Sequence, residues 1–338
     1  MKIEIARSLM RGLTLAGLAY AGVGFGAVQA AWQPTKTVEF IVPAGTGGGA
    51  DQMARMLQGI IQKHSLMPQS LVVINKAGGA GAEGFLDVKG SNRNPHKIII
   101  TLSNLFTTPL ATGVPFKWED LTPVAMLGLD EFVLWVNAKS PHKTAKDFVE
   151  AAKTANPPLK TGGNGSKRED HLISVTMEQA AGIKITYIPY QGGGPSSVQL
   201  AGGHIDANMN NPAEEIANWR SGAVKPLCVF SDKPLTYTQK ITADMAWSDV
   251  PTCVSQGLDV NYQMLRGMFM PGKVTPEQQA FYVDLFRKVS ETPDWKAYVE
   301  RNALVPDFRS GQAFVEFLTT DEQKHKDLMG KAGFIGTN

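Results

Sequence analysis

The sequence predicts an α/β fold, and three observations support that prediction. Short β-branched or apolar runs alternate with segments whose apolar residues recur every three or four positions, as in strands followed by helices. The chain has 338 residues, which is more than one typical domain. Hydrophobic residues make up 43% and charged residues 19%, the composition of a packed globular protein. We therefore expect two domains, or one domain between whose parts the chain crosses twice.

Residues 1–30 have the pattern of an export signal. A basic start is followed by the apolar stretch 13–26 and a small-residue cleavage site, and the residues concerned are Lys2, Arg7, Arg11 and Val28-Gln29-Ala30. The apolar stretch is shorter than the roughly 20 residues of a membrane-spanning helix. We expect a signal peptide over 1–30, cleavage after Ala30, and a mature protein outside the cytoplasm.

The mature chain is close to electrically neutral. The whole chain has 33 Lys and Arg against 31 Asp and Glu. Removing residues 1–30, which hold three basic residues and one acidic residue, leaves 30 of each sign. This balance gives no electrostatic reason to expect nucleic acid as a partner.

The expected strands are short runs, several of them apolar throughout as in strands buried on both faces. In chain order they are Thr37 to Val42, Leu71 to Ile74, Lys97 to Leu102, Phe132 to Val136, Ile185 to Ile188, Ile205 to Met209 and Lys225 to Phe230. Helices are expected between them, and one has Met53, Leu57 and Ile60 on a single face. Capping patterns at Thr144 and Thr275 predict two further helix starts. The alternation favours largely parallel pairing.

Three glycine clusters follow strands and precede helices. They are Gly45 to Gly49, Gly162 to Ser166, and Gly192 to Gly194. Glycine lets a ligand approach the backbone closely, and the free N–H groups of a helix N-terminus favour an anion there. Because these clusters end strands, they are expected to meet at the carboxyl edge of the sheets. The first cluster also fits a dinucleotide fingerprint, but no acidic residue ends the next strand, so we expect no cofactor.

On these motifs the chain resembles the periplasmic solute-binding proteins of tripartite tricarboxylate transporters, the Bug or TctC-like family. The resemblance covers residues 33–336, and the motifs in order carry it. They are Val42 to Asp51, Asn75 to Gly81, Gly162 to Ser166 with His171-Leu172, Ile188 to Gly192, Leu200 to Asp206, and Val250-Pro251-Thr252. It implies a type II periplasmic-binding-protein fold, with two α/β lobes and a ligand cleft between them. We place lobe 1 at 31–136 and 263–338, and lobe 2 at 137–262.

The resemblance also implies a function and a site. The protein would be periplasmic, would capture a small organic acid between its lobes, and would deliver it to the membrane permease subunits of a tripartite transporter; we expect a monomer. The expected ligand-binding residues are Pro43, Ala44, Gly45, Thr46, Gly47, Gly48, Gly49, Asp51, Ser103, Gly162, Gly163, Asn164, Gly165, Ser166, His171, Tyr190, Gly192 and Asn211. Two departures, Lys167 to Asp170 and Asn210-Asn211, leave the identity of the ligand open.

Two functions other than solute binding make different demands on the sequence. A secreted sensor subunit would bind ligand in the same way, and a hydrolase would require Ser166, His171 and Asp206 to act together. The sequence has no G-x-S-x-G, P-loop, H-E-x-x-H or C-x-x-C motif, and its histidines lie far apart, so we expect neither an enzyme nor a metal site. The adjacent acids Glu169-Asp170 and Glu214-Glu215 are explained as first-turn helix acids.

The chain has two cysteines, Cys228 and Cys253. In an oxidising compartment such a pair can form a disulfide. Two buried free thiols are the alternative that the sequence leaves open.

Overall fold

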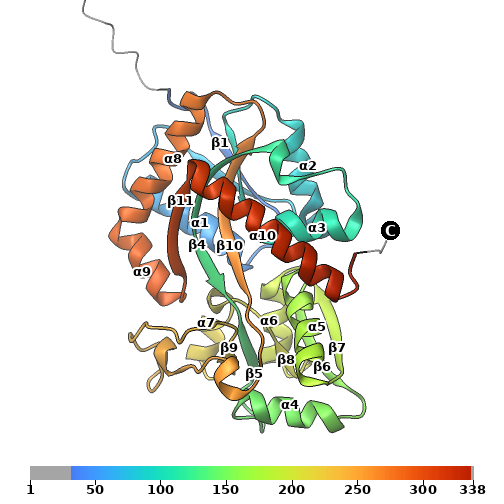
Figure 1. The fold of residues 1–338 in the computed structure, drawn as a ribbon. Coiled ribbons are helices and arrows are strands. Elements are labelled where there is room, and N and C mark those ends of the chain that lie inside the picture. The colour runs from blue at the N-terminus through green and yellow to red at the C-terminus, as the bar shows by residue number, and fades with distance from the viewer. Residues whose placement is uncertain (1–31, 336–338) are drawn as a thin grey trace, which may run out of the picture. The chain divides into compact units, whose positions relative to one another are not determined.

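Two β-sheets with helices packed on them organise the part of the chain that the computed structural model describes, residues 32–335. Figure 1 shows the six-stranded sheet with α1, α2, α3, α8, α9 and α10 around it, and the five-stranded sheet with α4 to α7. The fold is therefore α/β with two lobes, as the sequence predicted. The signal peptide expected over 1–30 lies outside the described residues.

The first sheet has the strand order β11-β4-β10-β3-β1-β2. Its strands are β1 (Val38–Val42), β2 (Leu71–Asn75), β3 (Lys97–Thr101), β4 (Leu121–Glu131), β10 (Gln263–Pro271) and β11 (Val305–Ser310). Its helices are α1 (Gly49–Lys63), α2 (Ala82–Gly90), α3 (Asn104–Thr112), α8 (Pro276–Glu291), α9 (Pro293–Arg301) and α10 (Gly311–Lys331).

The second sheet has the strand order β7-β6-β8-β5-β9. Its strands are β5 (Val133–Asn137), β6 (Leu159–Asn164), β7 (Ile185–Tyr190), β8 (Ala207–Asn208) and β9 (Val224–Val229). Its helices are α4 (Ala145–Thr154), α5 (Glu169–Ala181), α6 (Gly193–Ala201) and α7 (Pro212–Arg220).

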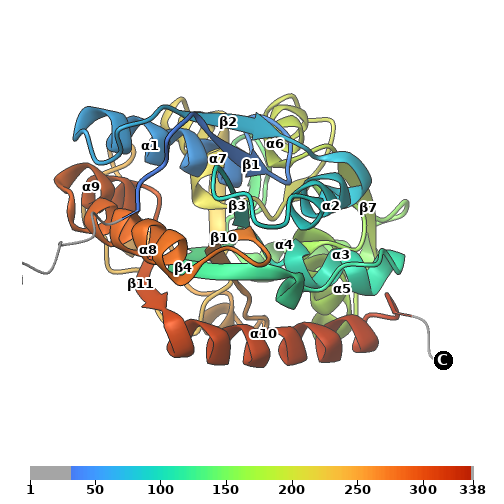
Figure 2. The ribbon, with the colours of Figure 1, turned by 90° about the horizontal axis from the view of Figure 1, so that it is seen from above.

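Alternate residues of each strand face different helices. In β1, Phe40 packs in the cluster that contains α1 and α8, whereas Ile41 packs with Phe85 of α2 and Phe314 of α10. In β5, Leu134 faces α4 and α5, whereas Trp135 packs on Trp219 of α7. Figure 2 shows α10 and α1 on opposite sides of the first sheet. Burial on both faces explains why these strands read as unbroken apolar runs.

Every predicted strand is present, with ends shifted by up to two residues. The prediction of largely parallel pairing is wrong. Within residues 32–335, four strand pairings are parallel and five are antiparallel. The antiparallel pairings involve β3, β4, β5, β8, β9, β10 and β11. Three of these strands, β4, β10 and β11, were missed because polar residues such as Asp130, Arg266 and Asp307 interrupt them.

The chain changes sheet twice. It leaves the first sheet at Phe132, between β4 and β5, and returns to it at Gln263, the first residue of β10. Lobe limits at 31–136, 137–262 and 263–338 stay a prediction.

A disulfide joins Cys228 of β9 to Cys253, with a Cα separation of 4.9 Å. This distance lies within the range that a disulfide requires, so the backbone accommodates the bond. Of the two alternatives that the sequence left open, the structure has the bonded pair.

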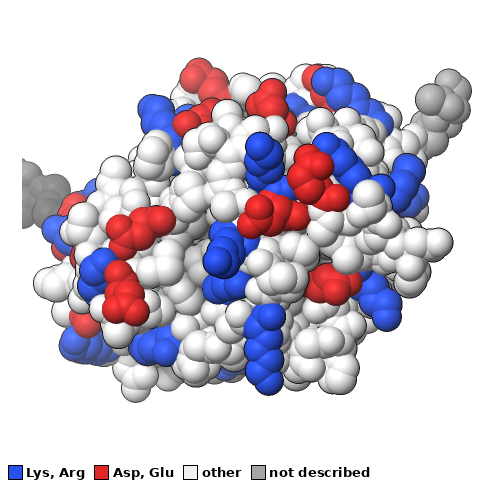
Figure 3. All heavy atoms as spheres, turned by 90° about the horizontal axis from the view of Figure 1, so that it is seen from below, with Lys and Arg blue, Asp and Glu red and all other residues white. Residues whose placement is uncertain are grey.

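The face drawn in Figure 3 carries Lys and Arg side chains interspersed with Asp and Glu, without an extended region of one sign. Among residues 32–335, no helix has the length and apolar character required to cross a bilayer.

Candidate functional site

A cavity of about 520 Å³ lies between loops of the two sheets. The first sheet contributes Gly45, which follows β1, and Ala77, Gly79 and Ala80, which follow β2. The second sheet contributes Asn164 to Arg168 at the end of β6, and Tyr190 at the end of β7. These loops follow the carboxyl ends of strands, which is where α/β proteins bind ligands. We call this space the outer cavity.

A second, much smaller space lies between the first turns of helices from both sheets. It measures about 10 Å³, which is near the lower limit for one water molecule. Its lining residues are Ala44, Gly48, Gly49, Ala50, Leu102, Phe132, Asn164, Glu169, Asp170, Asn211, Glu214 and Met264. We call it the inner cavity. An organic ligand can occupy it only if the two lobes move apart.

The loop between β1 and α1 is held by its own hydrogen bonds. Gly47 has a φ of 80°, a left-handed conformation that favours glycine. Its N–H donates to Asp51 Oδ2 at 2.9 Å, and the same carboxylate pairs with Arg55. Gly48, the next residue, has a φ of −73° and is extended. Asp51 therefore shapes the loop and its carboxylate is already bonded.

The N-terminus of α1 is already bound to a carboxylate of this chain. The Gly49 N–H donates to Glu214 Oε1 at 2.8 Å, and the Asn211 N–H donates to Glu214 Oε2 at 3.1 Å. Glu214 belongs to the first turn of α7, so its side chain connects the two lobes. Burial raises the pKa of Glu214 to about 7, and the charge of Asp130 adds to this effect.

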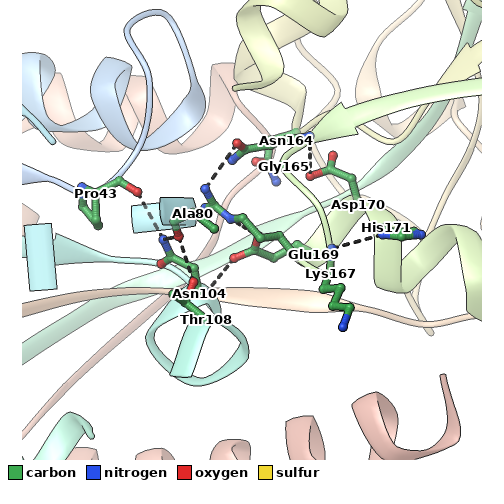
Figure 4. Close-up of polar contacts among 12 residues, drawn as sticks. Pro43, Ala80, Asn104, Thr108, Asn164, Gly165, Lys167, Glu169, Asp170 and His171 are labelled. Carbon is green, nitrogen blue, oxygen red and sulfur yellow. Dashed lines mark hydrogen bonds and ion pairs between the residues drawn. The ribbon is translucent and has the colours of Figure 1, made fainter. Parts of the chain in front are cut away.

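A second carboxylate makes an equivalent connection at α3. Glu169 Oε1 accepts the N–H of Asn104 at 2.8 Å, and Figure 4 shows this bond reaching from α5 to α3. Asn104 also donates its side-chain N–H to the Pro43 carbonyl at 3.1 Å. The position where a ligand carboxylate would meet this helix N-terminus is therefore taken by Glu169.

The loop between β6 and α5 contains the residues 167–170 that the sequence singled out. Lys167 has a φ of 57°, and its N–H donates to His171 Nδ1 at 3.0 Å. The His171 ring stacks on Tyr187, with 4.1 Å between ring centroids. Burial, together with the charge of Lys167, lowers the pKa of His171 to about 4. His171 is therefore neutral at pH 7, and its contacts hold the loop.

Arg168 and Asp170 complete this loop. Arg168 Nε donates to Glu169 Oε2 at 3.2 Å, and Nη1 donates to Asn164 Oδ1 at 3.2 Å. Arg168 Nη2 is buried and has no hydrogen-bond partner among the described residues. Asp170 Oδ2 accepts the Asn164 N–H at 3.2 Å. Burial raises the pKa of Asp170 well above its usual range, and the charges of Glu214 and Glu169 raise it further.

The structure brings many of the expected site residues together around the two cavities. Those that line them are Ala44, Gly45, Gly48, Gly49, Asn164, Gly165, Ser166, Tyr190 and Asn211. The other expected residues line neither cavity: Pro43, Thr46, Gly47, Asp51, Ser103, Gly162, Gly163, His171 and Gly192. Ser166, His171 and Asp206 are not joined by hydrogen bonds in the described chain; Asp206 Oδ2 accepts the Lys160 N–H at 2.7 Å.

Four residues of the site were missed from the sequence: Arg168, Glu169, Asp170 and Glu214. Their position in the first turns of α5 and α7, or next to one, gave a sufficient local explanation for the acids. The sequence does contain one signal, because residues 167–170 depart from the family pattern.

Two lobes with a ligand-sized cavity between their strand ends define a solute-binding protein. Residues 53–334 match the family described as "Tripartite tricarboxylate transporter family receptor", and the chain belongs to this family. It is 30% identical to Protein BugT of Bordetella pertussis (strain Tohama I) over 238 residues, which cover 68% of this chain and 72% of BugT.

Two solved structures are similar over most of the chain. A TctC solute-binding protein from Polaromonas is 28% identical, with a TM-score of 0.63, covering 88% of this chain and 99% of that protein. A protein of R. palustris solved with adipate is 22% identical, with a TM-score of 0.77, covering 89% of this chain and 98% of the other. The role of the present chain is solute binding.

Proposed function

We propose that this protein is a periplasmic receptor that captures a small organic acid between its lobes and delivers it to a tripartite transporter in the membrane. The observation that carries the proposal is the outer cavity of about 520 Å³, which is walled by strand-end loops of both sheets. The family of the chain and the adipate bound to its relative from R. palustris support the choice of ligand class.

Binding requires the lobes to separate and close again. The inner cavity is too small for an organic ligand in this conformation, so a ligand enters when the lobes rotate about β4 and β10, the strands next to the sheet changes. On closure the ligand faces Gly45, the loop of residues 164–168 and the guanidinium of Arg168, which line the outer cavity. A ligand that favours the closed form shifts the population toward it, which gives permease subunits a distinct surface to recognise.

Ligand binding is tested by the thermal stability of the purified mature protein across a panel of small acids. A ligand at 100 times its dissociation constant stabilises the native state by about 2.7 kcal/mol, which raises the melting temperature by several degrees. If no acid of the panel raises it, the proposed ligand class is wrong. Conversion of any acid to a product would instead favour the hydrolase alternative.

Export and delivery are tested separately. N-terminal sequencing of protein from the periplasmic fraction is expected to begin at Ala31, and a start at Met1 would contradict processing. Sedimentation is expected to give a monomer. Pull-down of permease subunits by the liganded protein would support delivery to a transporter, whereas capture of a sensor kinase would favour the sensing alternative.

A further inference from the structure

The inner cavity is lined by three acidic side chains, Glu169, Asp170 and Glu214, and none of its lining residues is basic. The three come from the first turns of α5 and α7. Glu169 and Glu214 bond to residues of the first lobe, whereas Asp170 bonds to Asn164 of its own lobe. Burial raises the pKa of Asp170 and of Glu214, and a ligand with carboxylates alone would bring no positive charge to stabilise their ionised forms.

The acids also occupy the backbone donors that would otherwise receive a ligand carboxylate. Gly49 N–H donates to Glu214, and Asn104 N–H donates to Glu169. The Asp170 carboxyl takes one long bond, 3.2 Å from the Asn164 N–H. The inner end of the cleft is therefore rich in acceptors, and it calls for a ligand group that donates hydrogen bonds.

The neighbouring Arg168 calls for a ligand group that accepts hydrogen bonds. Its side chain is 2% exposed, two of its nitrogens are used within the protein, and Nη2 has no partner in residues 32–335. Arg168 lines the outer cavity, so a ligand acceptor there would satisfy the remaining donor. The cleft thus has an acceptor-rich inner end and an unused guanidinium donor beside it.

A metal ion is a poor candidate for the positive charge. No group of three or more His, Cys, Asp or Glu side chains among the described residues is placed to hold one. An organic ammonium group needs no fixed coordination geometry, and it can donate to two carboxylates at once.

We propose that the cleft selects an organic acid that also carries a positively charged nitrogen, with the nitrogen held by Asp170 and Glu214 and the carboxylate by Arg168. This inference rests on the proposed solute-binding function and narrows its ligand class. It excludes simple dicarboxylates and tricarboxylates as the preferred ligands.

The experiment compares ligands of one carbon skeleton that differ only in their charged ends. Thermal shift is measured with succinate, 4-aminobutanoate and butane-1,4-diamine, with the corresponding six-carbon set, and with the standard amino acids; magnesium and calcium chloride are added alone as a metal control. We expect an amino-bearing acid to raise the melting temperature, and the diacid of the same skeleton to have a smaller effect or none.

The outcomes separate this inference from the function on which it rests. If diacids stabilise the protein and amino-bearing acids do not, solute binding stands and the charge selection is wrong. Stabilisation by a divalent cation alone would replace the ammonium site by a metal site. If no compound stabilises the protein, both proposals fail.

Calorimetry on variants then tests which residues hold the nitrogen and which hold the carboxylate of the ligand. The probe is the amino-bearing acid that raises the melting temperature most. Asp170→Asn keeps the size of the side chain. It is expected to lower the affinity for this probe about tenfold or more, which is the effect of losing one charge-assisted bond. The same variant is expected to bind the matching diacid more tightly than the parent does. Glu214→Gln, whose amide oxygen can still accept the Gly49 N–H, gives the same test if Asp170→Asn does not fold.

Arg168→Lys keeps a cation beside Glu169 and removes Nη2. We expect this variant to bind the amino-bearing acid more weakly than the parent does, and to bind the diamine of the same skeleton with unchanged affinity. Glu291→Gln is the matched control, because Glu291 is an exposed acid at the end of α8, far along the chain from the cleft acids, and its partner among residues 32–335 is Arg287. If Asp170→Asn and Glu214→Gln bind the probe as tightly as this control does, the acids do not hold the nitrogen.

Discussion

Glu214 Oε1 lies 2.8 Å from the backbone nitrogen of Gly49, a residue 165 positions earlier in the chain. The other oxygen, Oε2, accepts the Asn211 N–H at 3.1 Å. One carboxylate therefore joins the first turns of α1 and α7, where both helix dipoles favour negative charge. Burial opposes that charge and raises the pKa of Glu214 to about 7, so the bond between the lobes is formed by a group that titrates near neutrality.

Glu214 is expected to make the protein less stable as the pH rises. Its pKa moves from 4.5 to about 7 on folding, so between these values the folded protein holds a proton that the unfolded chain has released. The free energy of unfolding therefore falls through this window by about 3 kcal/mol for this group. Urea unfolding of the parent and Glu214→Gln from pH 4 to pH 8 measures the difference.

The comparison with Glu214→Gln removes the contribution of titrating groups that do not interact with Glu214, whereas Asp170 does interact with it. His171 acts in the opposite direction, because its pKa is lowered to about 4 and its stabilising effect grows as the pH rises toward 6.5. Both proteins share that effect, and it cancels in the difference. If the difference in free energy of unfolding between parent and variant does not change with pH, the pKa of Glu214 is not raised.

The role of Glu214 could not be read from the sequence, although the loop it binds could. The strand, the glycine turn and the helix around Gly47 are neighbours along the chain, and local rules predict them. The meeting of Glu214 with Gly49, and of Glu169 with Asn104, depends on how the two lobes pack. Each acid also has a sufficient local explanation as a first-turn helix residue, which hides its contact with the other lobe.

The strands near the sheet changes show the same limit. Buried runs such as Lys97 to Thr101 are apolar throughout and were predicted. β4 and β10 contain Asp130 and Arg266, whose charges neutralise each other only after the strands pair. A charged residue in each of two separate segments argues against a buried strand unless it is known that the two residues pair with each other.

The pair Asp130 and Arg266 is expected to be essential for stability. Arg266 is fully buried, its Nε donates to Asp130 Oδ2 at 2.9 Å, and a Cβ on Gly49 would lie 2.5 Å from its Nη2. Asp130→Ala leaves a buried guanidinium without its partner, which costs about 3 to 5 kcal/mol. Urea unfolding measures the loss, with the exposed Asp284→Ala as control. A loss below about 1 kcal/mol would show that the guanidinium finds another partner or water.

Gly45 is expected to control how closely the lobes approach. A Cβ on Gly45 would lie 2.1 Å from the Gln191 carbonyl oxygen, which belongs to the loop after β7 in the other lobe. The φ of Gly45 is not in the left-handed region, so alanine is compatible with the backbone of this loop. The added Cβ would nevertheless hold the two lobes apart. We expect Gly45→Ala to fold normally and to bind the best ligand of the panel at least tenfold more weakly.

Gly59→Ala is the control for this wedge. Gly59 lies on an exposed position of α1, where an added Cβ meets nothing within 4 Å. Alanine is favoured over glycine in a helix by up to about 1 kcal/mol, so this variant should be as stable as the parent or more so, with unchanged affinity. Equal affinity of Gly45→Ala and Gly59→Ala would show that closure does not bring Gly45 against Gln191.

The disulfide between Cys228 and Cys253 is expected to stabilise the second lobe. It closes a loop with a sequence separation of 25 residues, for which the chain-entropy argument gives about 3 kcal/mol. Cys228 is a fully buried residue of β9, and Cys253 is equally buried in the segment that leads back toward β10, so the bond ties that segment to the sheet.

Reduction, or the double variant Cys228→Ala with Cys253→Ala, should lower the urea midpoint of the protein, and the reductant should have no further effect on the variant. The double variant is the better comparison than a single one, because a single substitution leaves a buried thiol that can pair with another molecule. Thiol titration of the unfolded parent reports whether the bond is present, and two reactive thiols without added reductant, together with an unchanged midpoint in the variant, would contradict its contribution.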